Sequence, residues 1–495
     1  MLIQKMIRRG WMIFIFCQLL LPANAQQILT LERALEIALK NSPDIQLSLL
    51  NLKTSEQILK AQNAALKSNF SLNVTPFEYN KERAYNNTFG FWNTTEHTGS
   101  SGLFTISQPF LPTDATISLN NNFSWQYNTT ELDRDISPRS YRNYTYLSIT
   151  QPLFTYNRTK LTLKGLELDL ENAQLSYAMQ KLNLEKQVTQ FFYNVYLAQM
   201  SLAISQDEFT NTQKSFEITQ NKVTAGISAK EELYQAELNF ATAKSSLNNA
   251  QVTLDNYKDQ FKKYIGMDIM EEITVMTNVE LNPVTVDVKK AIEHGLNSRM
   301  ELRQRSIAIE KSQFTLIRTK EDRNAFNGDL ALSVGITGVD RDFSDIYDRP
   351  TNNPNVKVSF NIPIFDWGER KARINAQEAV IESNELQLSE EMKQITLDIR
   401  RIYRNLQNLV NQIDIASQNE RNAQLTYEIN LERYANGDLT SMDMNLFQTQ
   451  LSEKKMAYAQ SLIDYKIELL NLKIQSLYDF ERNEAVVPEN IIQKK

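Results

Sequence analysis

Long stretches of the chain place apolar residues with the period of an α-helix. Between positions 158 and 224 they recur three and four positions apart, for example at Leu166, Leu170, Ala173 and Tyr177. This spacing gathers them on one helical face, and the stretch holds one glycine and no proline. At ~1.5 Å of rise per residue, such a helix extends about 100 Å. A second stretch of equal length covers 369–435, and further helices are predicted at about 229–264 and 442–478.

Other segments alternate apolar and polar residues with a period of two. In 355–364 the apolar positions are Val356, Val358, Phe360, Ile362 and Ile364, and 329–338 alternates in the same way. About ten residues with one apolar face are typical of a tilted outer-membrane β-strand. A half-buried strand of a soluble sheet has the same pattern, so the strands alone leave both interpretations open.

An internal repeat organises these elements, and it is visible at three places in each half. Each copy runs through a helix, a strand, a loop, a strand, a long helix, a glycine turn and a helix. The alignment that pairs 152–158 with 363–369 continues without a gap to the two glycine turns. The matching pairs are 39–45 with 296–302, 152–158 with 363–369, and Gly226 with Gly437.

The repeat divides the chain into four parts. Residues 1–25 are predicted to be a signal peptide and 26–282 the first repeat, with strands at about 70–79 and 143–152 around an insert at 80–142. Residues 283–480 form the second repeat, with strands at about 329–338 and 355–364, and 481–495 form a C-terminal tail. The insert contains a hairpin signal around Phe110–Asp114. It adds either a pair of strands to the wall or a hairpin outside the membrane.

The N-terminus has the features of a secretory signal. Basic Lys5, Arg8 and Arg9 precede a short apolar run, and Ala23-Asn24-Ala25 supplies a cleavage pattern, which predicts a mature start at Gln26. Cys17, the single cysteine, would then be removed, so no disulfide framework or cysteine-rich metal site is expected.

Composition excludes several classes of function. The chain has 495 residues and a net charge of -6, which argues against a general nucleic-acid binder. No nucleophile elbow, phosphate loop or His-Glu-x-x-His motif is present. The two histidines, His97 and His294, are interpreted as incidental. We therefore expect no enzyme, no cofactor and no metal site.

The strand number indicates an oligomer. The chain supplies four strands, or six with the insert, and open sheet edges in lipid cost several kcal/mol per unpaired backbone group. Bacterial barrels close with eight or more strands, so several chains must share one barrel. Three chains give about 12 or 18 strands. The polar helices suit a thin wall with water on both faces, and they are expected to extend the barrel as a hollow tube.

At these residues the chain resembles the TolC-like outer membrane efflux proteins, the outer membrane factors of tripartite pumps. The resemblance rests on the duplicated half, on Asn-Ser-Pro-Asp-Ile at 41–45, on Pro-Ile-Phe-Asp-Trp-Gly-Glu-Arg at 363–370 and on the paired glycine turns. In the second repeat, Met300 replaces the usual proline. The resemblance implies a homotrimer, with a 12-stranded barrel in the lipid of the outer membrane and a long α-helical barrel in the periplasm. It also implies a passive duct that docks onto a periplasmic adaptor and an inner-membrane pump of the RND or ABC type.

The resemblance also implies roles for particular residues. The strand-to-helix junctions hold Pro152, Phe154, Pro363, Phe365 and Gly368, and the turns with Gly226, Ile227, Gly437 and Leu439 are expected to contact the adaptor. Tyr434 resembles a gating tyrosine, Glu232 stands where the family has its acidic acceptor, and Asp443 resembles one acid of a lumen ring. Leu439 and Leu446 stand where charged gate residues can occur, so the ionic part of the lock is open to question. Ordinary helix-start acids are the alternative interpretation of Glu232 and Asp443.

Three functions follow from this sequence. The first is an exit duct in the outer membrane of a double-membrane bacterium for small toxic compounds. The second keeps the duct but assigns it to a type I protein secretion system. The third is a soluble periplasmic coiled-coil scaffold or adaptor, which would leave the alternating segments as a sheet domain.

Overall fold

The fold is described from a computed structural model, which covers residues 27–87, 90–130, 139–277, 282–321, 325–436 and 438–486. The predicted signal peptide, Gly437 and the end of the predicted tail lie outside these residues. The chain forms two compact units. The sheet unit comprises Asn51–Gln174 and Gln304–Leu388. The helical unit comprises the described residues up to Leu50, Leu175–Arg303 and the described residues from Ser389 onward.

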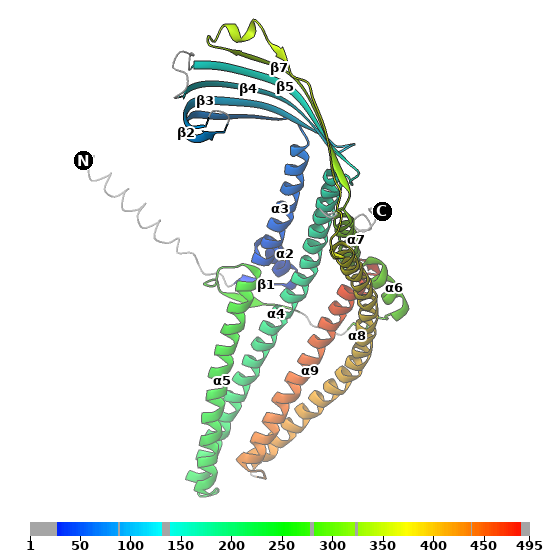
Figure 1. The fold of residues 1–495 in the computed structure, drawn as a ribbon. Helices are drawn as coiled ribbons and strands as arrows, with labels where there is room; N and C mark the ends of the chain where they lie inside the picture. Colours follow the sequence, from blue (N-terminus) through cyan, green and yellow to red (C-terminus); the bar gives the residue numbers. More distant parts are fainter. Residues whose placement is uncertain are drawn as a thin grey trace, which may run out of the picture. The chain divides into compact units, whose positions relative to one another are not determined.

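The sheet unit contains one large sheet, and most neighbouring strands in it pair as antiparallel hairpins (Figure 1). The order is β2-β3-β4-β5-β7, and both β8 and β9 pair with β7 on its far side. The strands are β2 Asn69–Asn86, β3 Phe91–Phe110, β4 Ala115–Thr130, β5 Arg139–Leu153, β7 Asn327–Asp340, β8 Thr351–Asn352 and β9 Asn355–Asn361.

The insert belongs to this sheet. It contains β3, β4 and the ends of β2 and β5, and β3 and β4 lie between the two strands of the first repeat. Strand β2 runs to Asn86, beyond its predicted end at 79, because β3 pairs with it up to Phe91. The structure therefore places both strands of the insert in the same sheet as the strands of the two repeats.

The sheet register collects apolar side chains on one face. Cross-strand partners form a row of Phe70, Ile106, Leu119, Leu147 and Val334, one residue from each of five adjacent strands. Most of these side chains are exposed in the single chain, and Phe70 is 65% exposed. Because side chains alternate between the faces of a strand, the neighbouring positions form a polar second face.

Four helices adjoin the sheet at its strand ends. Helix α3 (Pro43–Ala65) precedes β2, α4 (Arg158–Thr224) follows β5, α7 (Met300–Lys320) precedes β7, and α8 (Glu369–Asn436) follows β9. Within the sheet unit these helices make polar contacts with each other. Lys311 of α7 forms an ion pair with Asp169 of α4 at 2.6 Å, and Asn384 of α8 donates to Ser312 of α7 at 2.7 Å.

The helical unit holds the remaining lengths of the long helices and their partners. The periodic stretches form helices as predicted, with α4 and α8 followed by α5 (Lys230–Ile265) and α9 (Ser441–Ser476). The shorter elements are α2 Leu31–Asn41, α6 Val288–Ser298, β1 Gln27–Leu29, β6 Ile273–Val275, β10 Tyr478–Asp479 and β11 Glu484–Ala485. Met300 begins α7 and is only 2% exposed, so it keeps the helix start that a proline would mark.

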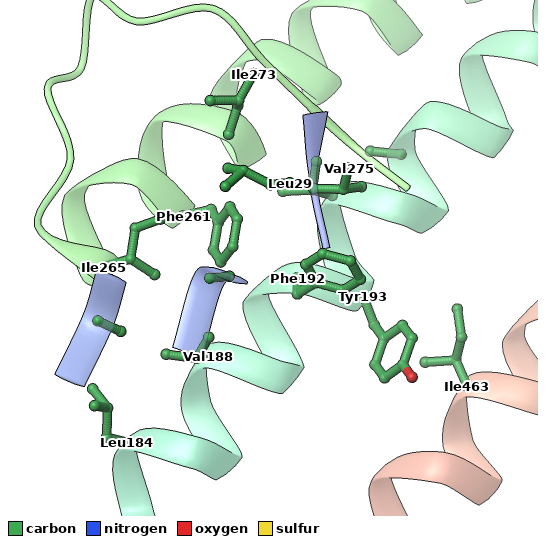
Figure 2. Close-up of a cluster of buried hydrophobic side chains, with 14 of the residues drawn as sticks. Leu29, Leu184, Val188, Phe192, Tyr193, Phe261, Ile265, Ile273, Val275 and Ile463 are labelled. Carbon is green, nitrogen blue, oxygen red and sulfur yellow. The ribbon is translucent and has the colours of Figure 1, made fainter. Parts of the chain in front are cut away.

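The first core of the helical unit surrounds Phe192 of α4. Phe261 of α5 approaches its ring edge-on, with centroids 6.1 Å apart. The parallel pair β1–β6 covers this site with Leu29 and Val275, and Ile463 of α9 reaches the same cluster (Figure 2). The cluster therefore joins the start of the chain to helices of both repeats.

A second core repeats this arrangement with α6, α8 and α9. It contains Ile395, Ile399 and Leu472. The gapless alignment that pairs the two glycine turns also pairs Leu184 with Ile395 and Val188 with Ile399, and all four residues are buried. The internal duplication predicted from the sequence is therefore present in the packing.

Membrane-crossing helices are not found among the described residues, since none of their helices is long and apolar enough to span a bilayer.

Candidate functional site

The far ends of α4 and α5 meet at the first glycine turn. Gly226 has φ 78°, a left-handed conformation that a side chain would strain. The backbone N–H groups of Ile227 and Ser228 both point to the carbonyl of Lys222, at 2.8 and 3.4 Å. These bonds satisfy the end of α4 in the manner of a Schellman cap. The turn leaves Ile227 76% exposed.

The second turn, between α8 and α9, is arranged similarly, although Gly437 lies outside the described residues. The N–H of Asp438 donates to the carbonyl of Arg433 at 3.0 Å. Leu439 is half-buried and packs on a small cluster of Tyr427, Tyr434, Met444 and Leu451, which we call the tip cluster. The two predicted adaptor-contact turns thus differ, because Ile227 is exposed and Leu439 is partly covered.

Tyr434 fastens α8 to α4. Its side chain is 2% exposed, and its hydroxyl lies 2.7 Å from Thr219 Oγ1 and donates to the carbonyl of Ser215 at 3.2 Å. Lys222 covers the ring at 4.8 Å and donates through Nζ to the Tyr434 carbonyl at 2.9 Å. Three residues of the first repeat therefore bind one tyrosine of the second.

Sequence reasoning selected Tyr434 but missed its partners. Thr219, Ser215 and Lys222 carry no motif, and they lie more than two hundred positions away in the chain. Glu232, proposed as the acceptor, lies half-buried in the first turn of α5. Among the described residues, the hydrogen bonds of the Tyr434 hydroxyl go to Thr219 and Ser215, and Glu232 is not a partner.

Asp443 helps to cap the N-terminus of α9. Thr440 donates to its carboxylate through Oγ1 at 2.7 Å and through the backbone N–H at 3.2 Å, while the Asp443 N–H donates to Thr440 Oγ1. This is a capping box. The hydrogen bonds from the Thr440 hydroxyl and N–H lower the pKa of Asp443 below its ordinary value of 3.8. The carboxylate thus has a local helix-capping role, while a place in a lumen ring stays a prediction.

Acid should weaken this helix start. Because the pKa of Asp443 is lower in the folded state, its stabilising effect is complete above the unfolded pKa and is lost as pH falls through the folded pKa. We expect amide exchange in the first turn of α9, corrected for intrinsic rates, to speed up as pH falls below about 4. Thr440→Ala should speed this exchange already at neutral pH. The same rates in the start of α2, which the Thr30 hydroxyl caps, serve as the reference; unchanged exchange in Thr440→Ala would contradict the capping role.

The strand-to-helix junctions are the second candidate region, after the helix tips, and the junction of the first repeat connects β5 to α4. Pro152 and Leu153 form the last pairs of β5 with β7, and Phe154 follows with φ 58°. The Phe154 ring packs on Phe326 and Phe360, with centroids 5.3 and 6.3 Å away. Two aromatic rings of the second repeat therefore contact the Phe154 side chain, which stays 64% exposed.

The second junction has the same sequence elements and a similarly exposed aromatic side chain. Pro363 follows β9, Gly368 has φ 83°, and Phe365 is 71% exposed. Among the described residues, the ring contact of Phe365 is with its near neighbour Trp367. Asp366 accepts from the N–H groups of Arg370 and Gly368, both at 3.0 Å, and these bonds lower its pKa.

No candidate metal site is found in the part of the chain that the structure describes. No group of three or more His, Cys, Asp or Glu side chains there could hold an ion.

Solved structures with the same fold are outer membrane channels. The CmeC outer membrane channel of Campylobacter jejuni matches with a TM-score of 0.70 and 14% identity, over 94% of this chain and 89% of that chain. The outer membrane protein VceC of Vibrio cholerae matches with a TM-score of 0.63 and 12% identity, over 91% and 95%. The open state of the MtrE outer membrane channel of Neisseria gonorrhoeae matches with a TM-score of 0.64 and 13% identity, over 92% of this chain and 90% of that chain.

These matches show that the chain has the fold of an outer membrane channel protomer, with the mixed helix–strand architecture expected from the sequence. The sequence matches no curated protein. The family described as "Outer membrane efflux protein" matches residues 108–267 and 296–474, more than half of the chain. The chain belongs to the outer membrane efflux protein family, which confirms the resemblance to TolC-like proteins.

Proposed function

We propose that three copies of this chain form a passive exit duct in the outer membrane. The observation that carries the proposal is the sheet, which has one mainly apolar face and two edge strands, β2 and β9, that lack a second neighbour in the described chain. In lipid, each unpaired backbone group of such an edge costs several kcal/mol. Pairing of β9 with β2 of the next copy satisfies the edge of β9, which has 7 residues, and the part of the 18-residue β2 that lies beside it.

The aromatic contacts at the first junction support a ring of copies. Within the chain, Phe154 of the first repeat packs on Phe326 and Phe360 of the second and stays 64% exposed. Phe365, the equivalent residue of the second repeat, is 71% exposed, and among the described residues its ring contact is with Trp367. A neighbouring copy would place a first repeat next to it. The contact between repeats would thereby recur between copies.

The helical part has the properties of a duct wall rather than of a solid core. Helices α4 and α8 have 67 and 68 residues, and each therefore extends about 100 Å. Their mean composition is polar, and among the described residues many of their buried apolar side chains gather in the two cores and the tip cluster. Water on both sides of the helices fits this pattern. We infer that the helical barrel stands in the periplasm.

The turns at the helix tips are the proposed contact with a periplasmic adaptor. Ile227 offers an exposed apolar side chain beside Gly226, and Met442 of the second turn is 71% exposed. Gly437 and the half-buried Leu439 belong to the same proposed contact. An inner-membrane pump would supply the energy, because the described residues contain no phosphate-binding loop. The cargo we propose is small toxic compounds.

Planar-bilayer recordings of the purified protein test this function. We expect the detergent-extracted mature protein to migrate as a heat-labile trimer and to produce discrete single-channel openings. A protein that is extracted without detergent and gives no channels would refute the duct and favour the scaffold. Cargo is tested separately in a deletion strain: sensitivity to small toxic compounds supports efflux, whereas loss of a secreted polypeptide with unchanged sensitivity would assign the duct to protein secretion.

A further inference from the structure

The hairpin β3–β4 has no counterpart in the second repeat. Strands β2, β5, β7 and β9 each adjoin a helix, whereas β3 and β4 are joined to each other by the turn at 111–114. They have 20 and 16 residues, and 9–11 residues are enough to cross a bilayer at the usual tilt. The added strands are thus long enough to be part of a transmembrane wall.

Both faces of the sheet continue through the added strands. On the apolar face, Ile106 and Leu119 stand in the same row as Phe70, Leu147 and Val334. On the opposite face, the next row consists of small polar residues from six strands, namely Asn69, Ser107, Ser118, Ser148, Ser333 and Asn355. A hairpin standing in water would have no need of an apolar row in register with its neighbours.

The turn of the hairpin is fixed to the start of α4. The Asp114 carboxylate accepts from the backbone N–H groups of Arg158 and Thr159, both at 3.2 Å. Asn157 donates from Nδ2 to the carbonyl of Leu111 at 2.5 Å, and Gln151 donates from Nε2 to the carbonyl of Thr113 at 2.7 Å. The turn therefore lies at the level of the strand-to-helix junction.

We propose that each chain contributes six strands, so that three chains close an 18-stranded wall in place of the 12-stranded barrel implied by the family resemblance. This inference rests on the proposed duct and adds its width. The seam between copies joins β9, which runs toward its helix α8, to β2, which runs away from α3, so the pairing is antiparallel. The apolar residues of both edges, such as Val358 and Leu72, lie on the same face of the sheet.

Simple geometry shows why six strands suit this chain. Strands spaced ~4.8 Å apart and tilted by ~40° each occupy ~6.3 Å of circumference, so six occupy ~38 Å. Helices packed side by side need roughly 8–10 Å each, so the four helices that adjoin the sheet need roughly 32–40 Å. Four strands would cover only ~25 Å. Six strands therefore match the width of the helical wall that they adjoin.

The wider wall changes what can limit transport. By the same spacing, an 18-stranded barrel has a backbone radius of ~18 Å, compared with ~12 Å for 12 strands. The membrane section would then be no narrower than the helical tube. Cargo size is consequently limited at the helix tips, where Tyr434 binds α4, and the membrane section admits solutes that a 12-stranded barrel would exclude.

Cysteine labelling tests the position of the added strands. In a Cys17→Ser background, Leu119→Cys and Ser118→Cys report on β4, and Val334→Cys and Ser333→Cys are the matched controls on β7. Each variant is labelled with a small environment-sensitive fluorophore in detergent and reconstituted into phosphatidylcholine vesicles with or without brominated acyl chains. We expect quenching at 119 and 334 and none at 118 and 333.

The outcomes separate this inference from the proposed function. Quenching at 334 but not at 119 would place the hairpin outside the membrane and overturn the wider wall, while the duct would stand. No quenching at 334 would overturn the membrane sheet itself and both proposals with it. Electron cryomicroscopy of the detergent-purified full chain provides the second measurement: eighteen strands around the axis are expected, and twelve strands with a projecting hairpin would overturn the inference.

Discussion

Replacing Phe192 with alanine is expected to loosen the helical unit by about 3–5 kcal/mol, the usual cost of removing a fully buried aromatic side chain. Phe192 is 0% exposed and contacts Phe261 and Tyr193 edge-on. The cavity would open beneath the β1–β6 pair, which has only three residues in each strand. Hydrogen exchange of the β1 and β6 amides in the native state should then accelerate at least 100-fold, because 1.4 kcal/mol corresponds to a factor of ten.

Tyr234→Ala is the matched control for this experiment. Tyr234 lies on α5, like Phe261, but it is 67% exposed. Its removal should change the same exchange rates by less than a factor of about three, since surface substitutions usually cost within 0.5 kcal/mol. If Phe192→Ala accelerated exchange by less than tenfold, the cluster would not be the element that holds the start of the chain to the helices.

Tyr434→Phe is expected to favour the open state of the helix tip. The substitution keeps the ring in the tip cluster and removes the hydroxyl that binds Thr219 and Ser215. Thr219 keeps its own bond to the Ser215 carbonyl at 2.8 Å, so the buried hydroxyl does not lose every partner. A loss of about 1 kcal/mol corresponds to roughly a fivefold shift of the closed–open equilibrium in each chain. Single-channel recordings should show a higher open probability and larger conductance.

Two further variants make the result specific. Thr219→Val should reproduce the effect, and the double variant should add little, because both substitutions break the same bond. Tyr427 belongs to the same cluster, and its hydroxyl has no hydrogen bond among the described residues. Tyr427→Phe should therefore leave conductance unchanged. Equal conductance in Tyr434→Phe and the unchanged protein would remove Tyr434 from the closure of the duct.

The helices were the part of this fold that sequence could predict most closely. The predicted helix at 158–224 coincides with α4, and the predicted helix at 369–435 ends one residue before α8 does. Absence of proline leaves little to interrupt such a helix, and the three-four spacing specifies its buried face. The two cores then follow from the repeat, since a gapless alignment superposes their buried positions.

The long-range contacts could not be predicted in this way. The β1–β6 pair has three residues per strand and joins positions 27–29 to 273–275, so neither alternation nor proximity in the chain marks it. The partners of Tyr434 are similarly remote. Thr219 and Ser215 look like ordinary polar residues of a helix, and only the packing of α4 against α8 makes them binding residues.

The insert shows an intermediate case. Its hairpin signal identified two strands, but sequence alone left their membership in the sheet open. The deciding contacts are the register with β2 and β5 and the cap that Asp114 gives to α4. In the second repeat, the start of α8 is capped by Asp366 from its own junction. The position of the capping residue in one repeat therefore did not predict its position in the other.

The hairpin also constrains how proteins of this type can change size during evolution. A two-strand addition restores both the chain direction and the apolar face, so β5 still delivers the chain to α4 as before. One added strand would reverse the chain and send the helix to the wrong side of the membrane. In a threefold assembly, a single insertion of this kind therefore enlarges the pore by six strands at once. Diameter would evolve in discrete steps, while the helical machinery keeps its sequence.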